Sequence, residues 1–243
     1  MQIRRLFVEN PLNPVVLCPE EHHYATRVLR LQPGHVVELI TPTGCMTGRI
    51  ESIDRETRIT AIGDPEIKNE PGIAVTLFQG LPDNMDKLEL IVQKAVELGA
   101  TRIVPFLSRH TDAKYRKIDL SRKMDRIRKI AREAVRQCKR TVVPLVPDPA
   151  DLPDIRSSLT ELDTTFLFYE KPVQEKLLMP AAPASAGIVI GPEGGFADHE
   201  VEQLLEWGTV PVYLPDRTLR TETAGLAALT LVMARFGDYR NLF

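Results

Sequence analysis

The feature that most constrains the fold of this chain is a change in the predicted pattern of secondary structure near residue 70. Before that point, short segments with the composition of β-strands follow one another closely, separated by turn-forming pairs such as Pro33-Gly34 and Gly63-Asp64. We expect strands at residues 3–8, 35–40, 45–52 and 57–62, and a helix at residues 19–30 with a proline in its first turn. Strands so closely spaced predict a small β-barrel.

After a linker at residues 69–72 (Asn-Glu-Pro-Gly), strands and helices alternate. The predicted strands are residues 74–79, 102–106, 164–168, 187–190 and 210–214, and the predicted helices are residues 85–98, 121–138, 198–206 and 222–235. Such alternation is typical of a mostly parallel sheet covered by helices. We therefore predict an α/β protein with one domain at residues 1–70 and a second at residues 71–243.

The composition is that of an ordinary globular protein, with 43% hydrophobic and 26% charged residues. No uninterrupted apolar run approaches the ~18 residues that a membrane span needs, and the first residues do not resemble a signal peptide. The three cysteines, Cys18, Cys45 and Cys138, lie far apart and form no CxxC pair. We expect a cytoplasmic protein without a membrane partner and without a metal site.

The charge of the chain is unevenly distributed along the sequence. The net charge is −2, but residues 109–140 contain 13 Lys and Arg against 4 Asp and Glu. From residue 141 to the end the balance reverses, with 7 cations against 15 acids. A chain of this kind can present one strongly positive face while staying nearly neutral overall, which favours a nucleic-acid partner.

A glycine-rich turn follows the apolar strand predicted at residues 187–190, with the sequence Gly-Pro-Glu-Gly-Gly-Phe at residues 191–196. In α/β proteins, ligands bind outside the carboxyl ends of strands, and glycines let the backbone approach them closely. The pattern is neither GxGxxG nor GxxxxGK[ST], so it indicates neither a dinucleotide nor a nucleoside triphosphate. A simple tight turn is the competing interpretation.

A second segment, residues 214–224, joins the end of a predicted strand to the start of a helix. Thr221 or Thr223 could be the N-cap of that helix, and Glu222 could interact with the helix dipole. These roles do not account for Arg217 and Arg220, because a helix N-terminus disfavours positive charge. Their position suggests that a function requires them.

The pair GPEGGF and LRTETA, at residues 191–196 and 219–224, resembles the knotted SPOUT methyltransferases. The resemblance is specifically to the RsmE family, which makes 3-methyluridine in small-subunit ribosomal RNA. It extends over the whole chain, through His23, Arg27, Val28, Leu29 and Arg30, through residues 93–99 and through residues 133–140. The chain departs from the family pattern at Asp83-Asn84, Arg136, Lys139 and Thr218.

The resemblance implies a PUA-like β-barrel that binds RNA at residues 1–70 and a SPOUT methyltransferase domain with a C-terminal trefoil knot at residues 71–243. It further implies a homodimer that binds S-adenosylmethionine, with 16S rRNA or the 30S subunit as substrate and a role in rRNA processing and ribosome biogenesis. The cofactor-binding residues implied by the match are Leu167, Phe168, Tyr169, Ile190, Gly191, Pro192, Glu193, Gly194, Gly195, Leu214, Leu219, Arg220, Thr221 and Ala224.

Methylation at N3 of uridine requires loss of the N3 proton and leaves negative charge on the ring carbonyls. Arg220 is the candidate to stabilise that charge, as an oxyanion hole does. Glu193 or Glu222 is the candidate proton acceptor, and water remains an alternative. The reaction needs no metal, because the methyl group of the cofactor is already activated.

Basic side chains on the helix predicted at residues 121–138 recur at spacings of three and four, which predicts a stripe that contacts RNA. The predicted RNA-binding residues are Arg122, Arg126, Lys129, Arg136 and Arg140 on or just after this helix, and Arg4, Arg27 and Arg30 in the first domain. Two alternatives stay open. One is a non-catalytic RNA-binding protein that kept the fold, and the other is a methyltransferase that modifies a ribose 2′-oxygen.

Overall fold

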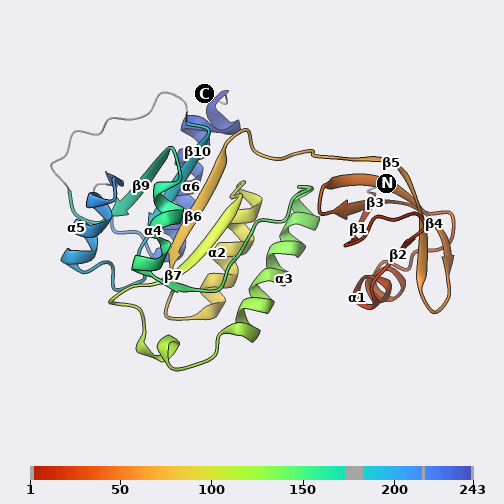
Figure 1. Cartoon of the computed structure of the whole chain (residues 1–243), viewed down its shortest axis with the longest axis horizontal. Helices are drawn as coiled ribbons and strands as arrows, with labels where there is room; N and C mark the ends of the chain where they lie inside the picture. Colours follow the sequence, from red (N-terminus) through yellow and green to blue (C-terminus); the bar gives the residue numbers. More distant parts are fainter. Residues whose placement is uncertain (1–2, 173–182, 215–216, 242–243) are drawn as a thin grey trace. The chain divides into compact units, whose positions relative to one another are not determined.

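The computed structural model describes residues 3–172, 183–214 and 217–241 of the chain (Figure 1). They form two compact units. Unit 1 consists of Met1–Glu70 together with Val135–Val143, and unit 2 consists of Pro71–Ala134 and Pro144–Phe243. Among the described residues, no helix is long and apolar enough to cross a membrane.

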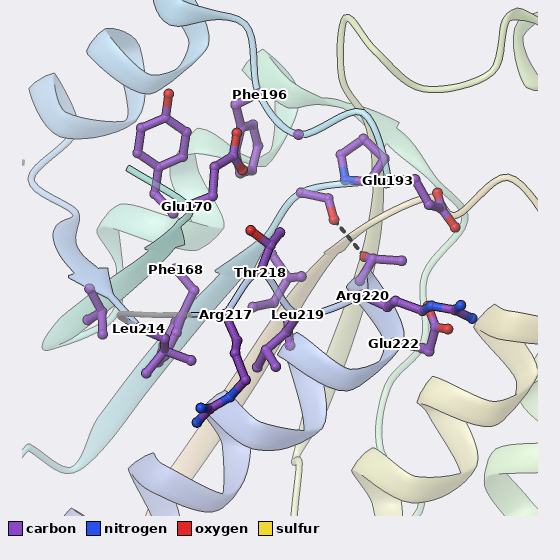
Figure 2. Close-up of a pocket in the computed structure, with 18 of the residues that line it drawn as sticks. Phe168, Glu170, Glu193, Phe196, Leu214, Arg217, Thr218, Leu219, Arg220 and Glu222 are labelled. Carbon is purple, nitrogen blue, oxygen red and sulfur yellow. Dashed lines mark hydrogen bonds between the residues drawn. The ribbon is translucent and has the colours of Figure 1, made fainter. Parts of the chain in front are cut away.

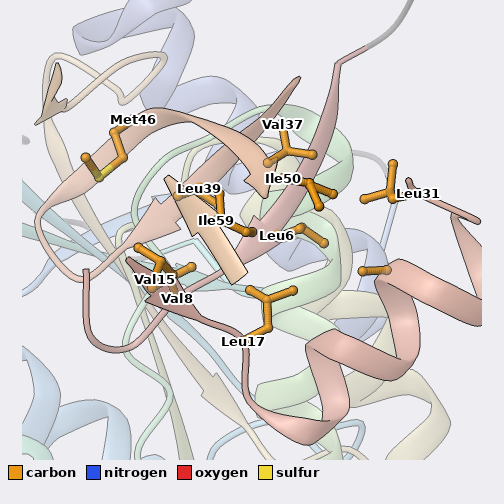
Figure 3. Close-up of a cluster of buried hydrophobic side chains, with 11 residues drawn as sticks. Leu6, Val8, Val15, Leu17, Leu31, Val37, Leu39, Met46, Ile50 and Ile59 are labelled. Atoms are coloured by element: carbon orange, nitrogen blue, oxygen red, sulfur yellow. The ribbon is translucent and has the colours of Figure 1, made fainter. Parts of the chain in front are cut away.

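Unit 1 is built on one five-stranded sheet with the order β1-β3-β4-β5-β2. The strands are β1 (Arg4–Phe7), β2 (Val15–Val16), β3 (Val36–Thr41), β4 (Gly44–Ile53) and β5 (Thr57–Glu66). Apolar side chains from all five strands or the residues beside them meet in one core, which includes Leu6, Val15, Leu39, Ile50 and Ile59 (Figure 3). The sheet curls around this core, and it fits the small barrel predicted from the sequence.

The helix predicted at residues 19–30 is shorter than expected. Helix α1 covers Pro19–His23, and one π-helical turn, η1 (Tyr24–Val28), follows it. Arg30 has a left-handed backbone, with φ of 52°, so the chain has left the helix before that residue. The prediction of one continuous helix over residues 19–30 was therefore wrong at its end, and Arg30 does not belong to the same helix as Arg27.

Unit 2 is a six-stranded sheet in which every pairing is parallel, with the order β11-β9-β10-β6-β7-β8. The strands are β6 (Ala74–Gly80), β7 (Arg102–Leu107), β8 (Ala150–Asp151), β9 (Thr164–Tyr169), β10 (Ser185–Ile190) and β11 (Val210–Tyr213). The helices are α2 (Met85–Glu97), α3 (Ser121–Cys138), α4 (Arg156–Thr160), α5 (Asp198–Glu206) and α6 (Thr221–Phe236). The predicted α/β class with a parallel sheet is confirmed.

Local chemistry explains where the well-predicted elements of unit 2 start and stop. Helix α2 begins after Asn84, whose side chain accepts a hydrogen bond from the Asp86 backbone N–H. It ends before Gly99, which has φ of 98°. By contrast, β8, the 3₁₀ turn η3 (Leu152–Ile155) and α4 lie between residues 138 and 164, where the sequence pattern predicted neither helix nor strand.

Candidate active site at the carboxyl ends of the parallel strands

A cavity of about 600 Å³ opens in unit 2 beyond the carboxyl ends of β9, β10 and β11 and beside the first turn of α6 (Figure 2). This edge of a parallel sheet is where α/β proteins bind their ligands. The side chains and backbone that line the cavity come from Lys87, Phe168, Tyr169, Glu170, Ile190, Gly191, Pro192, Glu193, Gly195, Phe196, Val212, Tyr213, Leu214, Arg217, Thr218, Leu219, Arg220, Thr221, Glu222 and Ala224.

The glycine loop, residues 191–196, forms one wall of this cavity and packs against the end of β6. A Cβ atom on Gly80 would lie only 2.6 Å from the backbone nitrogen of Pro192, so no side chain fits at that position. On the opposite side of the sheet end, Thr221 Oγ1 donates a hydrogen bond of 2.6 Å to the carbonyl oxygen of Gly191 (Figure 2). The same hydroxyl accepts a hydrogen bond of 2.9 Å from Gln79 Nε2. The loop is thus fixed to β6 and to α6.

This role of Thr221 corrects the expectation that it, or Thr223, caps helix α6. The helix begins at Thr221 itself, Arg220 is the N-cap residue, and no side chain caps it. Thr221 is only 5% exposed, and its hydroxyl is occupied by the loop and by Gln79. Its hydroxyl therefore binds the glycine loop to α6. A capping hydroxyl would instead have accepted a hydrogen bond from a backbone N–H of α6 itself.

Both carboxylate oxygens of Glu193 are held by residues at the start of α2. Lys87 Nζ lies 2.7 Å from Glu193 Oε1, and the Asp83 backbone N–H donates to Glu193 Oε2 at 2.9 Å. Lys87 also pairs with Asp83 at 2.9 Å. The hydrogen bonds to Glu193 and Asp83 raise the pKa of Lys87, and the hydrogen bond from Lys87 lowers the pKa of Asp83. As a proton acceptor, Glu193 would have to break its pair with Lys87.

Glu222, in the first turn of α6, differs from Glu193 in this respect. Its Oε2 atom is buried and accepts no hydrogen bond from the residues that the structure describes. An unsatisfied buried polar atom is costly and uncommon in native proteins, so it points to a missing partner. Glu222 lines the cavity, so this unpartnered oxygen belongs to a residue in the wall of the candidate site.

Two cations lie beside this carboxylate in the sequence and also line the cavity. Arg217 and Arg220 are exposed, and neither forms an ion pair within residues 3–172, 183–214 and 217–241. Arg220 stands directly at the N-terminus of α6, where the helix dipole disfavours positive charge. The cavity therefore combines a carboxylate, Glu222, with the unpaired guanidinium groups of Arg217 and Arg220. A carboxylate can accept a proton, and a guanidinium can stabilise a developing negative charge.

Most of the predicted cofactor residues meet at this cavity, and two do not. Leu167 is fully buried in the core of unit 2, with its side chain packed beneath the strand ends. At Gly194, a Cβ atom would lie 2.8 Å from the Cβ atom of His110, and the residue does not line the cavity. Sequence reasoning missed Lys87, because nothing near it in the sequence indicates a pairing with a residue 106 positions away.

The predicted RNA-binding residues are scattered. Arg4, Arg27 and Arg30 are exposed in unit 1, and Arg122, Arg126 and Lys129 are exposed on α3 in unit 2. The Arg126 guanidinium pairs with Glu89 at 2.8 Å.

Arg136 and Arg140 do not belong to an exposed stripe. Their side chains are only 8% and 5% exposed, and they pair with Glu21 and Glu70. The Arg136 guanidinium also stacks 4.1 Å from the ring centre of Tyr24. Residues 135–143 belong to unit 1, and Val135 and Arg140 are buried there. The structure therefore removes both arginines from the predicted RNA-binding set.

Among the described residues, no group of three or more His, Cys, Asp or Glu side chains is arranged to hold a metal ion.

Comparison with known proteins places the chain in a family. The model of the RNA methyltransferase domain family matches residues 68–233. The chain is 30% identical to the ribosomal RNA small subunit methyltransferase E of Bacillus subtilis, over 95% of this chain and 96% of the relative. It is 28% identical to the protein of that name from Buchnera aphidicola, over 98% and 96% of the two chains.

Two solved structures share the whole fold. A putative methyltransferase from Legionella pneumophila in complex with bound S-adenosylmethionine superposes with a TM-score of 0.86, at 27% identity and over 98% of this chain and 100% of that one. The ribosomal RNA small subunit methyltransferase E of Neisseria gonorrhoeae, also bound to S-adenosylmethionine, superposes with a TM-score of 0.84, at 26% identity and with the same coverage. These matches confirm the resemblance read from the sequence. The chain belongs to the ribosomal RNA small subunit methyltransferase E family.

Proposed function

We propose that this chain transfers the methyl group of S-adenosylmethionine to N3 of a uridine in 16S rRNA. The observation that carries the proposal is the buried, unpartnered carboxylate oxygen of Glu222 beside the unpaired Arg220, in the cavity at the carboxyl ends of the parallel strands. Membership of the family and the S-adenosylmethionine bound to two relatives of similar structure support the same conclusion.

The cavity fits the proposed cofactor. Its volume of about 600 Å³ lies within the range of small-molecule sites, and the apolar side chains of Phe168, Leu214 and Leu219 line it. These side chains suit an adenine ring. When bound, S-adenosylmethionine supplies a methyl group that needs no further activation.

The protein has two tasks beyond holding the reactants in line. The N3 proton of uridine goes to the carboxylate of Glu222, a lining residue whose Oε2 atom accepts no hydrogen bond from the described residues. The negative charge that then spreads to the ring carbonyls is stabilised by the Arg220 guanidinium. Glu193 takes no part in proton transfer, because Lys87 and the Asp83 backbone N–H already engage its two oxygens.

The decisive experiment is methylation of 16S rRNA by the purified chain with isotope-labelled S-adenosylmethionine, followed by mass spectrometry of the nucleosides. We expect label in 3-methyluridine. Glu222→Gln should slow single-turnover methylation by about 10²-fold or more, the usual contribution of general-base catalysis. Glu202→Gln, at an exposed position of α5, is the matched control and should be as active as the wild type. Label in a 2′-O-methylated nucleoside, or in none, would contradict the proposal.

The finer architecture is also part of the proposal, with residues 1–70 as a PUA-like barrel that binds RNA and residues 71–243 as a knotted SPOUT domain. Strand β11 lies at the edge of the sheet beside β9, whereas the next helix, α6, packs on β10 and β6. Residues 217–220, which lead into α6, line the cavity at the carboxyl ends of these strands, where the proposed knot would bring the chain.

A homodimer is the proposed assembly. Leu90 on α2 and Leu231 on α6 are 44% and 48% exposed, and the two helices pack against each other. Exposed apolar side chains on neighbouring helices favour a protein partner at that face. Sedimentation velocity should give a dimer for the wild type and a monomer for Leu231→Asp. A monomeric wild type at micromolar concentration would contradict the assembly.

A further inference from the structure

A basic loop at residues 108–117 borders the wall of the cavity within unit 2. His110 Nδ1 lies 2.9 Å from the carbonyl oxygen of Gly194, in the glycine loop. The Arg109 backbone N–H donates to Glu200 Oε1 at 2.7 Å, at the start of the helix that follows the glycine loop. Lys114 Nζ donates to the carbonyl oxygen of Asp83, the residue that also binds Glu193 and Lys87. The basic loop is therefore bound to the glycine loop and to the start of α2, next to the cavity, although none of its own residues lines the cavity.

The basic loop is held in one conformation by its own side chains. Thr111 Oγ1 accepts a hydrogen bond of 2.9 Å from the Ser108 backbone N–H, and Asp112 accepts one of 2.9 Å from the Lys114 backbone N–H. Tyr115 is buried inside the 3₁₀ turn η2 (Ala113–Arg116). These contacts fix the backbone of the basic loop. The Cα atoms of its cationic residues therefore have defined positions beside the glycine loop.

The charges on the basic loop are not balanced by its surroundings. It contains four cations, Arg109, Lys114, Arg116 and Lys117, and only one acid, Asp112. Lys114 pairs with Asp112, and Arg116 pairs with Asp151. Arg109 and Lys117 are exposed and have no ion pair or side-chain hydrogen bond to the described part of the chain.

Two cations of α3 also have acidic partners. Arg126 pairs with Glu89, and Arg128 pairs with both Asp125 and Asp148. Arg217 and Arg220 line the cavity itself, and Arg109 and Lys117 add exposed positive charge on the loop that contacts the glycine loop.

We propose that the basic loop binds the phosphates of the RNA strand that flank the target uridine, through Arg109 and Lys117. This inference rests on the proposed function, because a uridine held in the cavity must leave its neighbouring nucleotides at the rim. Phosphates there would meet two exposed cations that no carboxylate neutralises. Arg and Lys at such positions fix the register of the strand and are insensitive to its sequence.

The test is the double variant Arg109→Gln/Lys117→Gln, with binding to fluorescein-labelled oligouridine and to 16S rRNA measured by anisotropy and filter retention over a range of salt concentrations. Each lost phosphate contact on a single strand should lower the log–log salt slope by about 0.7, so the double variant should lose about 1.4. This difference in slope corresponds to roughly 25-fold weaker RNA binding by the variant at 0.1 M salt. The affinities of the variant and the wild type should converge near 1 M salt. The double variant Lys94→Gln/Arg156→Gln removes the same charge elsewhere in unit 2 and should show a much smaller change.

Further measurements separate this inference from the proposed function. The variant should bind S-adenosylmethionine with wild-type affinity in calorimetry, and methylate saturating RNA at close to the wild-type single-turnover rate, while kcat/KM falls. Unchanged RNA affinity and an unchanged salt slope would overturn the inference. So would an equal loss of RNA affinity in the control variant, or a loss of RNA affinity that persists at 1 M salt. Unchanged RNA affinity would also favour an acidic protein, instead of RNA, as the partner of the basic loop. A wild type that neither binds the cofactor nor methylates RNA would instead contradict the proposed function.

Discussion

Replacing Thr221 with valine isolates the contact that joins the glycine loop to helix α6. Valine has nearly the shape of threonine but lacks the hydroxyl, which donates to Gly191 O at 2.6 Å and accepts from Gln79 Nε2 at 2.9 Å. The site is only 5% exposed, so water does not readily replace the lost partner. At about 1 kcal/mol for each hydrogen bond, the variant should lose roughly 2 kcal/mol of unfolding free energy.

For a chain of this size, that loss corresponds to a fall in melting temperature of about 4–8 °C. If the whole loss were instead expressed in the cofactor complex, the affinity for S-adenosylhomocysteine would fall by no more than about 30-fold. Thermal unfolding by circular dichroism and calorimetric titration measure the two quantities. Thr230→Val, at an exposed position of the same helix where the hydroxyl bonds only to Leu226 O, is the matched control. If Thr221→Val behaved like this control in both assays, the hydroxyl would not be what holds the loop.

Three further predictions concern charged residues. Lys87→Met should lower the melting temperature. Because Lys87 lowers the pKa of Asp83 below its ordinary value of 3.8, the pairing stabilises the folded state above that pH and is lost as the pH falls through the lowered pKa. The melting-temperature difference between wild type and variant should therefore be constant from about pH 5 to 8 and shrink below about pH 4. Arg220→Lys should slow single-turnover methylation at least roughly tenfold and change cofactor affinity less than about threefold, because an ammonium cannot replace the planar donor; a wild-type rate would remove Arg220 from the mechanism. Arg140→Met should lower the unfolding free energy in urea by about 3–5 kcal/mol, because it leaves Glu70 without its buried partner. It should not change the salt dependence of RNA binding. A changed log–log salt slope would indicate that Arg140 contacts RNA after all.

The sequence was informative wherever a local pattern determines the structure. Apart from the two-residue β8, the parallel strands of unit 2 are mostly apolar runs, and α2 is delimited by the cap at Asn84 and by Gly99 with its positive φ. The position of the glycine loop after β10 also followed from the order of elements. These features depend on neighbours within a few residues, and periodicity and capping describe such neighbours well.

The errors concern interactions between distant residues. The spacing of Arg136 and Arg140 is that of a helix surface, but their burial depends on Glu21 and Glu70, which lie 115 and 70 residues away. The pairing of Glu193 with Lys87, which distinguishes Glu193 from Glu222, likewise joins residues that are 106 positions apart. A single sequence carries no signal for such pairings, because one ion pair leaves no periodic trace.

The close contact between Gly80 and Pro192 has a consequence for ligand binding. Strand β6 is a buried strand in the middle of the sheet, and the glycine loop touches its last residue with no space for even one extra carbon atom. The loop therefore loses its conformational freedom when the sheet forms, before any ligand arrives. An incoming cofactor does not have to order this wall of its site, so its affinity is not reduced by that entropic cost.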